Sequence, residues 1–154
     1  MNDKFSEAEN QGRQKLKKDL DSSKYQTLYH FTEDKFNPLD CFITAITNNQ
    51  DNTYAVEIKN RNILFTQYEN DGFILEVAKY NALMDAYTNS GYTPLYLNYF
   101  NDARVIWDVS KLEDVDNRWI TKDCTRTTAE NYGNRIPKKV ILLSPSEGKV
   151  RRYS

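Results

Sequence analysis

The chain has 154 residues, which is enough for one domain with a hydrophobic core and too short for two domains of ordinary size. Hydrophobic residues make up 39% of the sequence, so burial can offset the entropy lost on ordering, and we expect a folded protein. The net charge of -1 provides no overall attraction to a polyanion. Any contact with nucleic acid must therefore come from local clusters of Lys and Arg.

The sequence also argues against membrane insertion, secretion and histidine-dependent catalysis. No run of 18 or more apolar residues occurs, and residues 1–20 are polar where a signal peptide needs an apolar stretch. Cys41 and Cys124 are far apart and lack a zinc-binding pattern, so we expect reduced thiols in a cytosol. The only histidine, His30, lies in an aromatic run typical of a structural role, which disfavours Ser-His-Asp and Cys-His mechanisms.

The first third of the chain predicts one helix and three strands. Residues 5–20 are mostly helix formers with few apolar positions, which indicates a surface helix, within an N-terminal helical segment that we place at 1–22. Residues 25–31 alternate in the manner of a strand. Residues 39–46 and 54–59 also predict strands, and the Asn- and Asp-rich segment between them favours an antiparallel hairpin.

The best-marked element is a helix predicted over residues 72–90. Its apolar residues recur at alternating spacings of four and three, which places them on one helical face. Asp71 is a candidate N-cap, and Gly91 suits the position that follows a helix C-terminus.

The last third predicts further strands. Residues 95–100 and 103–109 indicate two strands joined by a short turn, residues 113–135 a polar connection, and residues 140–143 a last strand. Residues 144–154 form a basic tail. The order of elements predicts a single α/β or α+β domain over 1–154, without internal repeats.

One group of residues is a candidate for metal binding and catalysis. Alternation along residues 54–59 places Glu57 and Lys59 on one face of a strand whose other face is apolar. If the hairpin centres on Gln50, Asp40 pairs near Asn60, within about 7–8 Å of those side chains. We therefore expect Asp40, Glu57 and Lys59 to converge.

Two adjacent carboxylates suit Mg²⁺, which commonly takes one or two protein carboxylates and keeps several waters. A neighbouring lysine can orient or help deprotonate one of those waters. Water activated in this way can attack a phosphodiester, while the cation neutralises charge on the phosphate. The same triplet occurs again as Glu147-Gly148-Lys149, so Glu-x-Lys alone is a weak signal.

The segment Pro38-Leu39-Asp40, followed after sixteen residues by Glu57-Ile58-Lys59, resembles the signature of the PD-(D/E)xK nuclease superfamily, with one residue inserted between Pro and Asp. The predicted order of elements over residues 7–100 is similar to that family's αβββαβ core. The resemblance implies a restriction-endonuclease-like fold, in which helices flank a mixed central sheet, here with extra C-terminal strands.

The resemblance also implies further site residues. An acidic residue on the first helix often completes the metal site in this family, and Glu9, or failing that Glu7, occupies that place. Many relatives carry a Gln or Lys on the helix after the ExK strand, and Lys79 matches that position. The implied metal ligands are then Glu9, Asp40 and Glu57 for Mg²⁺, with Mn²⁺ as a substitute. The implied catalytic residues are Asp40, Glu57, Lys59 and Lys79.

The implied activity is that of a metal-dependent endonuclease acting on DNA, encoded by a bacterium or a phage and cytoplasmic. It would serve repair, recombination, restriction or phage replication, and a junction-resolving member would act as a homodimer. Cationic residues that could contact phosphates are Arg61, Arg126, Lys138 and Lys139. Three alternatives stay open: Glu57 and Lys59 form a plain ion pair on a solvated strand, the fold is an inactive DNA-binding or virion component, or the chain is an unrelated α+β interaction module.

Overall fold

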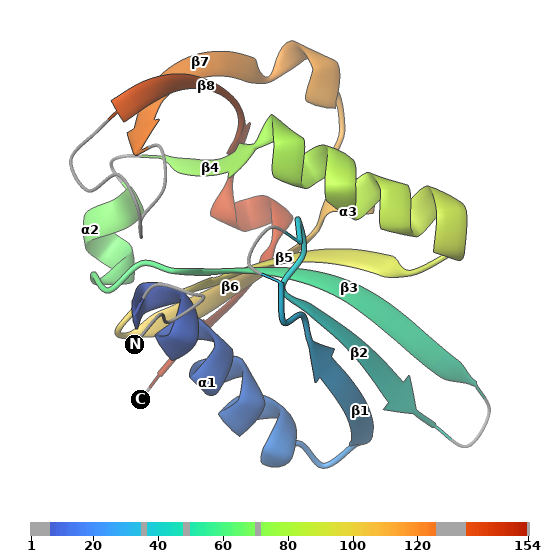
Figure 1. Cartoon of the computed structure of the whole chain (residues 1–154). Coiled ribbons are helices and arrows are strands. Elements are labelled where there is room, and N and C mark those ends of the chain that lie inside the picture. The colour runs from blue at the N-terminus through green and yellow to red at the C-terminus, as the bar shows by residue number, and fades with distance from the viewer. Residues whose placement is uncertain (1–6, 35–36, 48–49, 70–71, 126–134, 154) are drawn as a thin grey trace.

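A computed structural model of the chain describes residues 7–34, 37–47, 50–69, 72–125 and 135–153. It contains a large and a small β-sheet (Figure 1). The large sheet has the strand order β1-β2-β3-β5-β6-β9, and the small sheet has the order β4-β8-β7. The strands of the large sheet are β1 Gln26–Phe31, β2 Cys41–Ile46, β3 Asp51–Asn60, β5 Thr93–Tyr99, β6 Ala103–Asp108 and β9 Lys149–Arg152. Those of the small sheet are β4 Phe73–Glu76, β7 Trp119–Thr125 and β8 Arg135–Leu143.

Helices cover both faces of the large sheet. The helix α1 lies on one face, and α3 with the small sheet lies on the other (Figure 1). The α-helices are α1 Glu7–Asp21, α2 Phe65–Glu69 and α3 Val77–Ser90; short 3-10 turns are η1 Val109–Lys111, η2 Val115–Asn117 and η3 Pro145–Glu147. None of the described helices has the length and apolar character needed to span a membrane.

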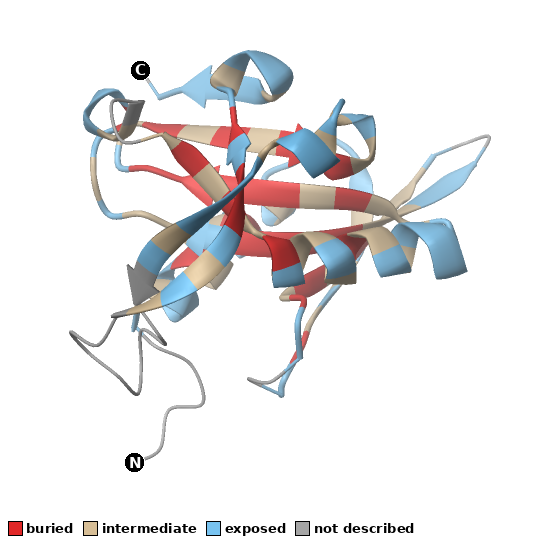
Figure 2. Cartoon of the chain, turned by 90° about the horizontal axis from the view of Figure 1, so that it is seen from above, coloured by how far each residue is buried: buried red, intermediate tan, exposed pale blue. Residues whose placement is uncertain are grey.

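The two faces bury separate hydrophobic cores, and the buried residues follow the central strands in Figure 2. On the α1 side, Leu16 packs with Val56 and Ile58 of β3. On the α3 side, Leu83 and Trp107 belong to a larger core that also contains the inner face of the small sheet. Because β3 lies between two covered faces, its centre is buried on both sides, as is usual for a strand inside a helix-covered sheet.

The strand β3 pairs antiparallel with β2 and parallel with β5, so the sheet is mixed, as predicted. The predicted hairpin is confirmed, but its predicted register is wrong. Cys41 pairs with Val56, which puts Asp40 beside Glu57 and not near Asn60. The reason is that β3 begins at Asp51, inside the segment expected to be loop, so the turn is shorter and centred earlier.

The helix predicted over residues 72–90 begins later than expected. Residues Phe73–Glu76 form β4, and the helix starts at Val77, with Glu76 as an N-cap that makes no side-chain cap bond. The expected cap, Asp71, lies outside the described residues. Pairing of β4 with the distant β8 overrides the local helical pattern. The end of the helix is confirmed: Gly91 has φ 72°, and its N–H donates to the carbonyl of Tyr87 at 3.0 Å.

The C-terminal third contains more strand than predicted. The expected connection over residues 113–135 includes β7, and β8 begins at Arg135, five residues before the expected strand. The basic tail includes η3 and β9, which pairs with β6 at the edge of the large sheet. Polar residues dominate β7, so its strand character depends on pairing with β8 and leaves little trace in the hydrophobic pattern.

Candidate active site

The strand β3 carries the centre of the candidate site. Val56 and Ile58 belong to the core on the α1 side, whereas Ala55 belongs to the core on the α3 side. Strand alternation therefore turns Glu57 and Lys59 toward α3. Glu57 is 8% exposed, so its carboxyl group is buried, while Lys59 is exposed at the end of the strand.

Asp40 and Glu57 form an acidic pair. Asp40 precedes β2, and its Oδ2 accepts a hydrogen bond from the backbone N–H of Ile58 at 2.8 Å. Burial raises the pKa of Glu57 well above its usual range, and the neighbouring charge of Asp40 raises it further. Within the described part of the chain, Oε2 of Glu57 is buried and makes no hydrogen bond. A buried carboxylate oxygen without a hydrogen bond is costly, and a ligand would offset that cost.

Lys79 joins this pair from α3. Its Nζ lies 3.4 Å from Oε2 of Glu57, an ion-pair distance whose geometry is not that of a hydrogen bond. The same ammonium donates to the carbonyl of Pro38 at 3.0 Å. Lys79 therefore lies between the loop that carries Asp40 and the strand that carries Glu57.

Lys59 lies two residues beyond Glu57 on the same face. Although much of the residue is exposed, desolvation lowers the pKa of its ammonium, and the charge of Arg61 lowers it further. Nearby Glu76, Glu57 and Glu9 act in the opposite direction. A lysine with a lowered pKa is a better proton acceptor than an ordinary surface lysine.

The helix α1 brings a cation to the acidic pair. Arg13 donates from Nη2 to Oδ1 of Asp40 at 3.1 Å and from Nη1 to the carbonyl of Thr32 at 2.6 Å. Sequence reasoning missed this residue. Its signal was its position three residues before the buried Leu16 and four after Glu9, which places it on the face of α1 that meets the sheet.

The expected third acidic ligand is not brought to the pair. Glu7 is exposed and accepts a hydrogen bond from Gln11 at 3.3 Å. Glu9 is also exposed, and its charge acts on Lys59. Within residues 7–34, 37–47, 50–69, 72–125 and 135–153, no three His, Cys, Asp or Glu side chains form a group able to hold a metal ion.

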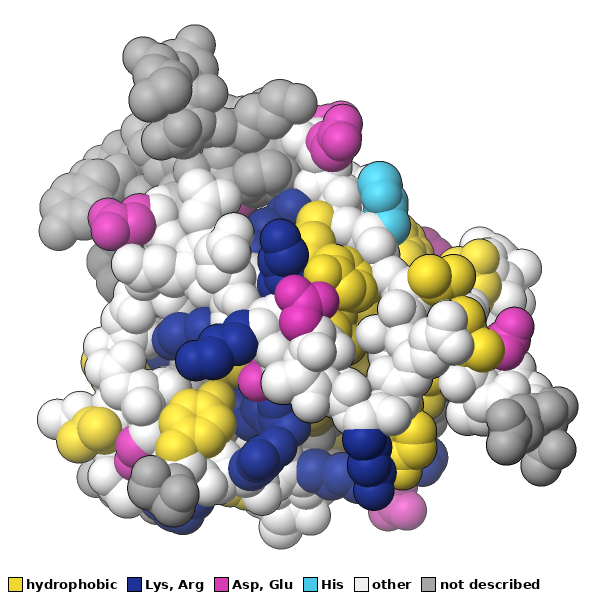
Figure 3. Space-filling view, turned by 90° about the horizontal axis from the view of Figure 1, so that it is seen from below, with side chains coloured by type: hydrophobic (Ala, Val, Ile, Leu, Met, Phe, Trp, Pro, Cys, Tyr) yellow, Lys and Arg dark blue, Asp and Glu magenta, His cyan; other side chains and the backbone are white. Residues whose placement is uncertain are grey.

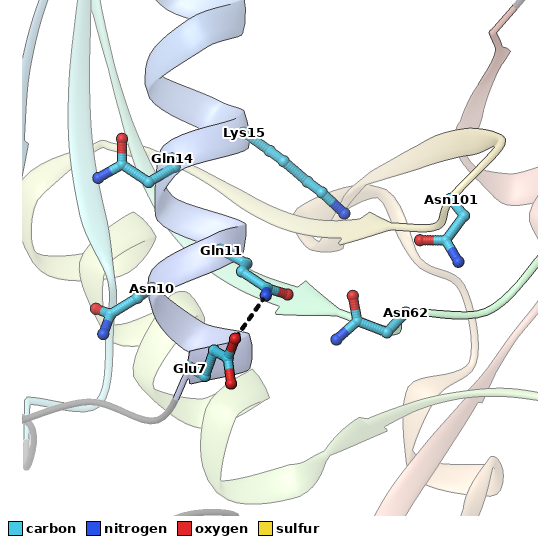
Figure 4. A pocket seen from close by; sticks show the side chains of 7 residues that line it. All are labelled: Glu7, Asn10, Gln11, Gln14, Lys15, Asn62 and Asn101. Atoms are coloured by element: carbon cyan, nitrogen blue, oxygen red, sulfur yellow. Dashed lines mark hydrogen bonds between the residues drawn. The ribbon is translucent and has the colours of Figure 1, made fainter.

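An open pocket of about 650 Å³, lined by residues with polar side chains, lies beside α1 near the end of β3 (Figure 4). The network next to it includes Lys15, whose Nζ donates to Oδ1 of Asn60 at 2.7 Å. Figure 4 shows Gln11 and Lys15 reaching from α1 toward the side of the pocket where Asn62 and Asn101 lie. The residues that line it are Glu7, Asn10, Gln11, Gln14, Lys15, Asn62 and Asn101.

The residues expected to contact nucleic acid differ in their surroundings. Arg61 turns inward: its Nε donates to Oδ1 of Asn98 at 3.0 Å, and its guanidinium lies 4.7 Å from the ring centroid of Tyr68. Its contacts are therefore within the protein.

Two of the other expected contacts, Lys138 and Lys139, lie on β8 of the small sheet. Lys138 pairs with Glu76 at 2.6 Å, and Lys139 is exposed over the ring of Trp119. Arg126 lies outside the described residues. On the opposite side, Figure 3 shows Lys and Arg side chains gathered on the face that carries α1. Lys17 and Lys18 of α1 are exposed.

The acidic pair fits a hydrated divalent cation. Asp40 and Glu57 are adjacent carboxylates, and Glu57 has a buried oxygen that lacks a hydrogen bond. A hard cation could coordinate that oxygen and offset the proximity of the two carboxylates. Mg²⁺ is consistent with this small ligand set, because water and substrate oxygens commonly complete its coordination.

Comparison with known proteins identifies the fold. No family model matches the chain, and no curated protein matches it in sequence. Among solved structures, it resembles Hjc, a Holliday junction resolvase from the archaeal hyperthermophile Archaeoglobus fulgidus, with a TM-score of 0.53 and 15% sequence identity. The match covers 94% of this chain and 91% of Hjc. The chain therefore has the restriction-endonuclease-like fold, and the fold implied by its resemblance to PD-(D/E)xK nucleases is confirmed.

Proposed function

We propose that this protein is a metal-dependent deoxyribonuclease, an endonuclease that hydrolyses phosphodiester bonds with Mg²⁺ or Mn²⁺. The observation that carries the proposal is the acidic pair, in which the buried Glu57 lies beside Asp40 and has an oxygen without a hydrogen bond. The restriction-endonuclease-like fold supports it independently. Two neighbouring carboxylates repel each other when both are ionised, and a bound cation would offset that repulsion.

Each proposed residue has a separate role. Asp40 and Glu57 would hold the cation, which when bound would activate water and offset charge on the phosphate. Lys59, whose pKa is lowered, would orient the attacking water or accept its proton. Lys79, at 3.4 Å from Glu57, would hold that carboxylate in place and contact the phosphate once substrate is bound.

The proposed substrate is DNA, contacted through phosphates by the exposed cations of the small sheet and of α1. Hjc is described as a Holliday junction resolvase, so branched DNA is the first substrate to examine. Cutting two strands of a junction requires two sites, and we propose that the protein would then act as a homodimer. Lys138 and Lys139 would position such a substrate, whereas the inward contacts of Arg61 favour a structural role for it.

A second candidate is an inactive DNA-binding protein that retains the nuclease fold. It is favoured by the hydrogen bonds to both oxygens of Asp40, from Arg13 and from the N–H of Ile58. It is also favoured by the lack of a third acidic ligand in the described part of the chain. In this alternative the protein would bind DNA without cleaving it.

One experiment separates the two candidates. The protein is incubated with supercoiled, linear duplex, single-stranded and four-way branched DNA, each with Mg²⁺, Mn²⁺ or EDTA, and binding is measured in parallel. The proposal expects cleavage of at least one substrate, abolished by EDTA. Binding without cleavage under every metal condition would favour the inactive protein, and cleavage in EDTA would rule out the metal-dependent mechanism.

A further inference from the structure

The helix α1 approaches β3 closely at Gly12. A Cβ added at this glycine would lie 3.0 Å from Cγ2 of Ile58 and 3.3 Å from Cβ of Asn60. The next residue, Arg13, is therefore held near the strand that carries Glu57. Its side chain is 11% exposed and reaches Asp40 from the helix. This partly buried arginine is a cation on the first helix, where the family resemblance implies an acidic residue.

The guanidinium of Arg13 is itself held in place by hydrogen bonds to Thr32. It donates to the carbonyl of Thr32 at 2.6 Å and to the hydroxyl of Thr32 at 3.2 Å, in addition to Asp40. That hydroxyl donates to the carbonyl of Leu39 at 2.7 Å, and the N–H of Thr32 donates to the carbonyl of Asp40 at 2.9 Å. The planar guanidinium of Arg13 thus joins three parts of the chain: α1, the end of β1, and the segment before β2. A guanidinium fixes the direction of its N–H donors better than a lysine ammonium does.

Both oxygens of Asp40 are consequently held. Arg13 donates to Oδ1 at 3.1 Å, and the N–H of Ile58 donates to Oδ2 at 2.8 Å. A carboxylate oxygen has two lone-pair sites, so each can accept a further bond without losing the one it has. Asp40 therefore remains able to bind a cation while its plane is fixed beside Glu57.

We infer that Arg13 is a positioning residue of the site, which orients the carboxylate of Asp40 for cation binding with Glu57. This inference rests on the proposed metal-dependent function. Residues that orient metal ligands typically affect metal affinity or activity by about 10- to 100-fold. The competing explanation is that Arg13 only fastens α1 to the sheet.

The chain offers a matched control for that explanation. Arg104 of β6 also joins α1 to the large sheet, through an ion pair of 2.5 Å with Asp19. Asp19 additionally accepts a hydrogen bond from the hydroxyl of Tyr99 at 2.7 Å. Replacing Arg104 therefore weakens the attachment of α1 without touching Asp40 or Glu57.

The test compares Arg13→Met, Arg13→Lys and Arg104→Met with the wild type. Mn²⁺ binding without DNA is measured by electron paramagnetic resonance, and Tm by circular dichroism. We expect Arg13→Met to weaken Mn²⁺ binding about 10-fold or more. Arg13→Lys, which keeps the charge but not the guanidinium, should lie in between. Arg104→Met should lower Tm and leave Mn²⁺ binding within about two-fold of wild type, a limit set by the change expected of a remote residue.

Several outcomes would overturn the inference. If Arg13→Met and Arg13→Lys bind Mn²⁺ as the wild type does, Arg13 does not position Asp40. If Arg104→Met weakens binding as much as Arg13→Met does, the effect comes from loosening α1. Should Arg13→Met fail to fold, Arg13→Lys and Arg104→Met give the same comparison. A wild-type protein that binds no Mn²⁺ would instead overturn the proposed metal dependence, and this inference with it.

Discussion

The chain contains two Glu-x-Lys triplets, and their surroundings are opposite. Glu57 of β3 is buried beside another carboxylate, and its pKa is raised. Glu147 of η3 is exposed and receives hydrogen bonds from Arg118, which lower its pKa. It also accepts from the backbone N–H of Ser144, closing a capping box at the start of η3. The first carboxylate has an oxygen that makes an ion pair with Lys79 but no hydrogen bond, whereas the second accepts several hydrogen bonds. The comparison therefore separates a candidate site from a structural motif.

The middle residues of the triplets differ in the same way. The N–H of Ile58 donates to the side chain of Asp40, which ties it to the acidic pair. The N–H of Gly148 donates to the carbonyl of Pro145 at 3.1 Å and belongs to a local turn. A Cβ at Gly148 would lie 2.9 Å from the carbonyl oxygen of Ile106, so close packing requires glycine there. The environment, and not the triplet, thus distinguishes the two.

The largest expected effect is on catalysis by the acidic residues. Glu57→Gln should lower the initial rate of DNA cleavage at saturating Mg²⁺ by about 10²-fold or more, because it removes charge from the cation site. Asp40→Asn should act similarly. Glu147→Gln, which removes a carboxylate from the other triplet, should leave the rate within a few-fold of wild type. Equal rates for Glu57→Gln and Glu147→Gln would refute the assignment of the site to β3.

The next effect separates the two lysines. Lys59→Ala should lower the cleavage rate by about 10²-fold, because it removes the group proposed to orient water, while leaving both carboxylates to bind metal. Lys149→Ala, at an exposed position of β9, should leave the rate within a few-fold of wild type. The check is a set of initial rates together with Mn²⁺ binding for both variants. Full activity of Lys59→Ala would show that its triplet has no catalytic role.

A smaller effect concerns stability at the second triplet. The pKa of Glu147 is lowered in the folded state. Its contribution to the free energy of unfolding is therefore present above the unfolded pKa and is lost as the pH falls through the folded pKa. Glu147→Gln should therefore destabilise the protein by about 1 kcal/mol at pH 7, the scale of a lost cap. The difference should shrink as the pH falls below about 4.3. Urea unfolding across this range measures it, and a difference that grows in acid would contradict the assignment.

The last expected effect has the opposite dependence on pH. The pKa of Glu57 is raised in the folded state, so its favourable contribution is present below the unfolded pKa and is lost as the pH rises through the folded pKa. In metal-free buffer, Glu57→Gln should gain stability relative to wild type as the pH rises from about 4.3. Thermal unfolding in EDTA at several pH values measures this change. If the stability of Glu57→Gln relative to wild type fell with rising pH, Glu57 would not be buried beside a like charge.

Much of the fold was predictable because its signals are local. Alternation in β3 indicates that Glu57 and Lys59 share a face, and Gly91 ends α3 because its φ of 72° suits glycine. Other elements depend on distant partners. The strand β4 pairs with β8 from far along the chain, and β7 has a polar sequence, so neither was expected.

The sequence by itself determined the residue types of the site and the face of β3 that carries two of them, because side-chain direction in a strand follows from position alone. Only the tertiary structure decided that Asp40 lies beside Glu57, because the register depends on where the hairpin turns. It alone revealed that α1 contributes Arg13, where an acidic residue was expected. Which residue of a helix meets a distant carboxylate depends on how closely the helix packs, here at Gly12, and that packing is set by the whole fold.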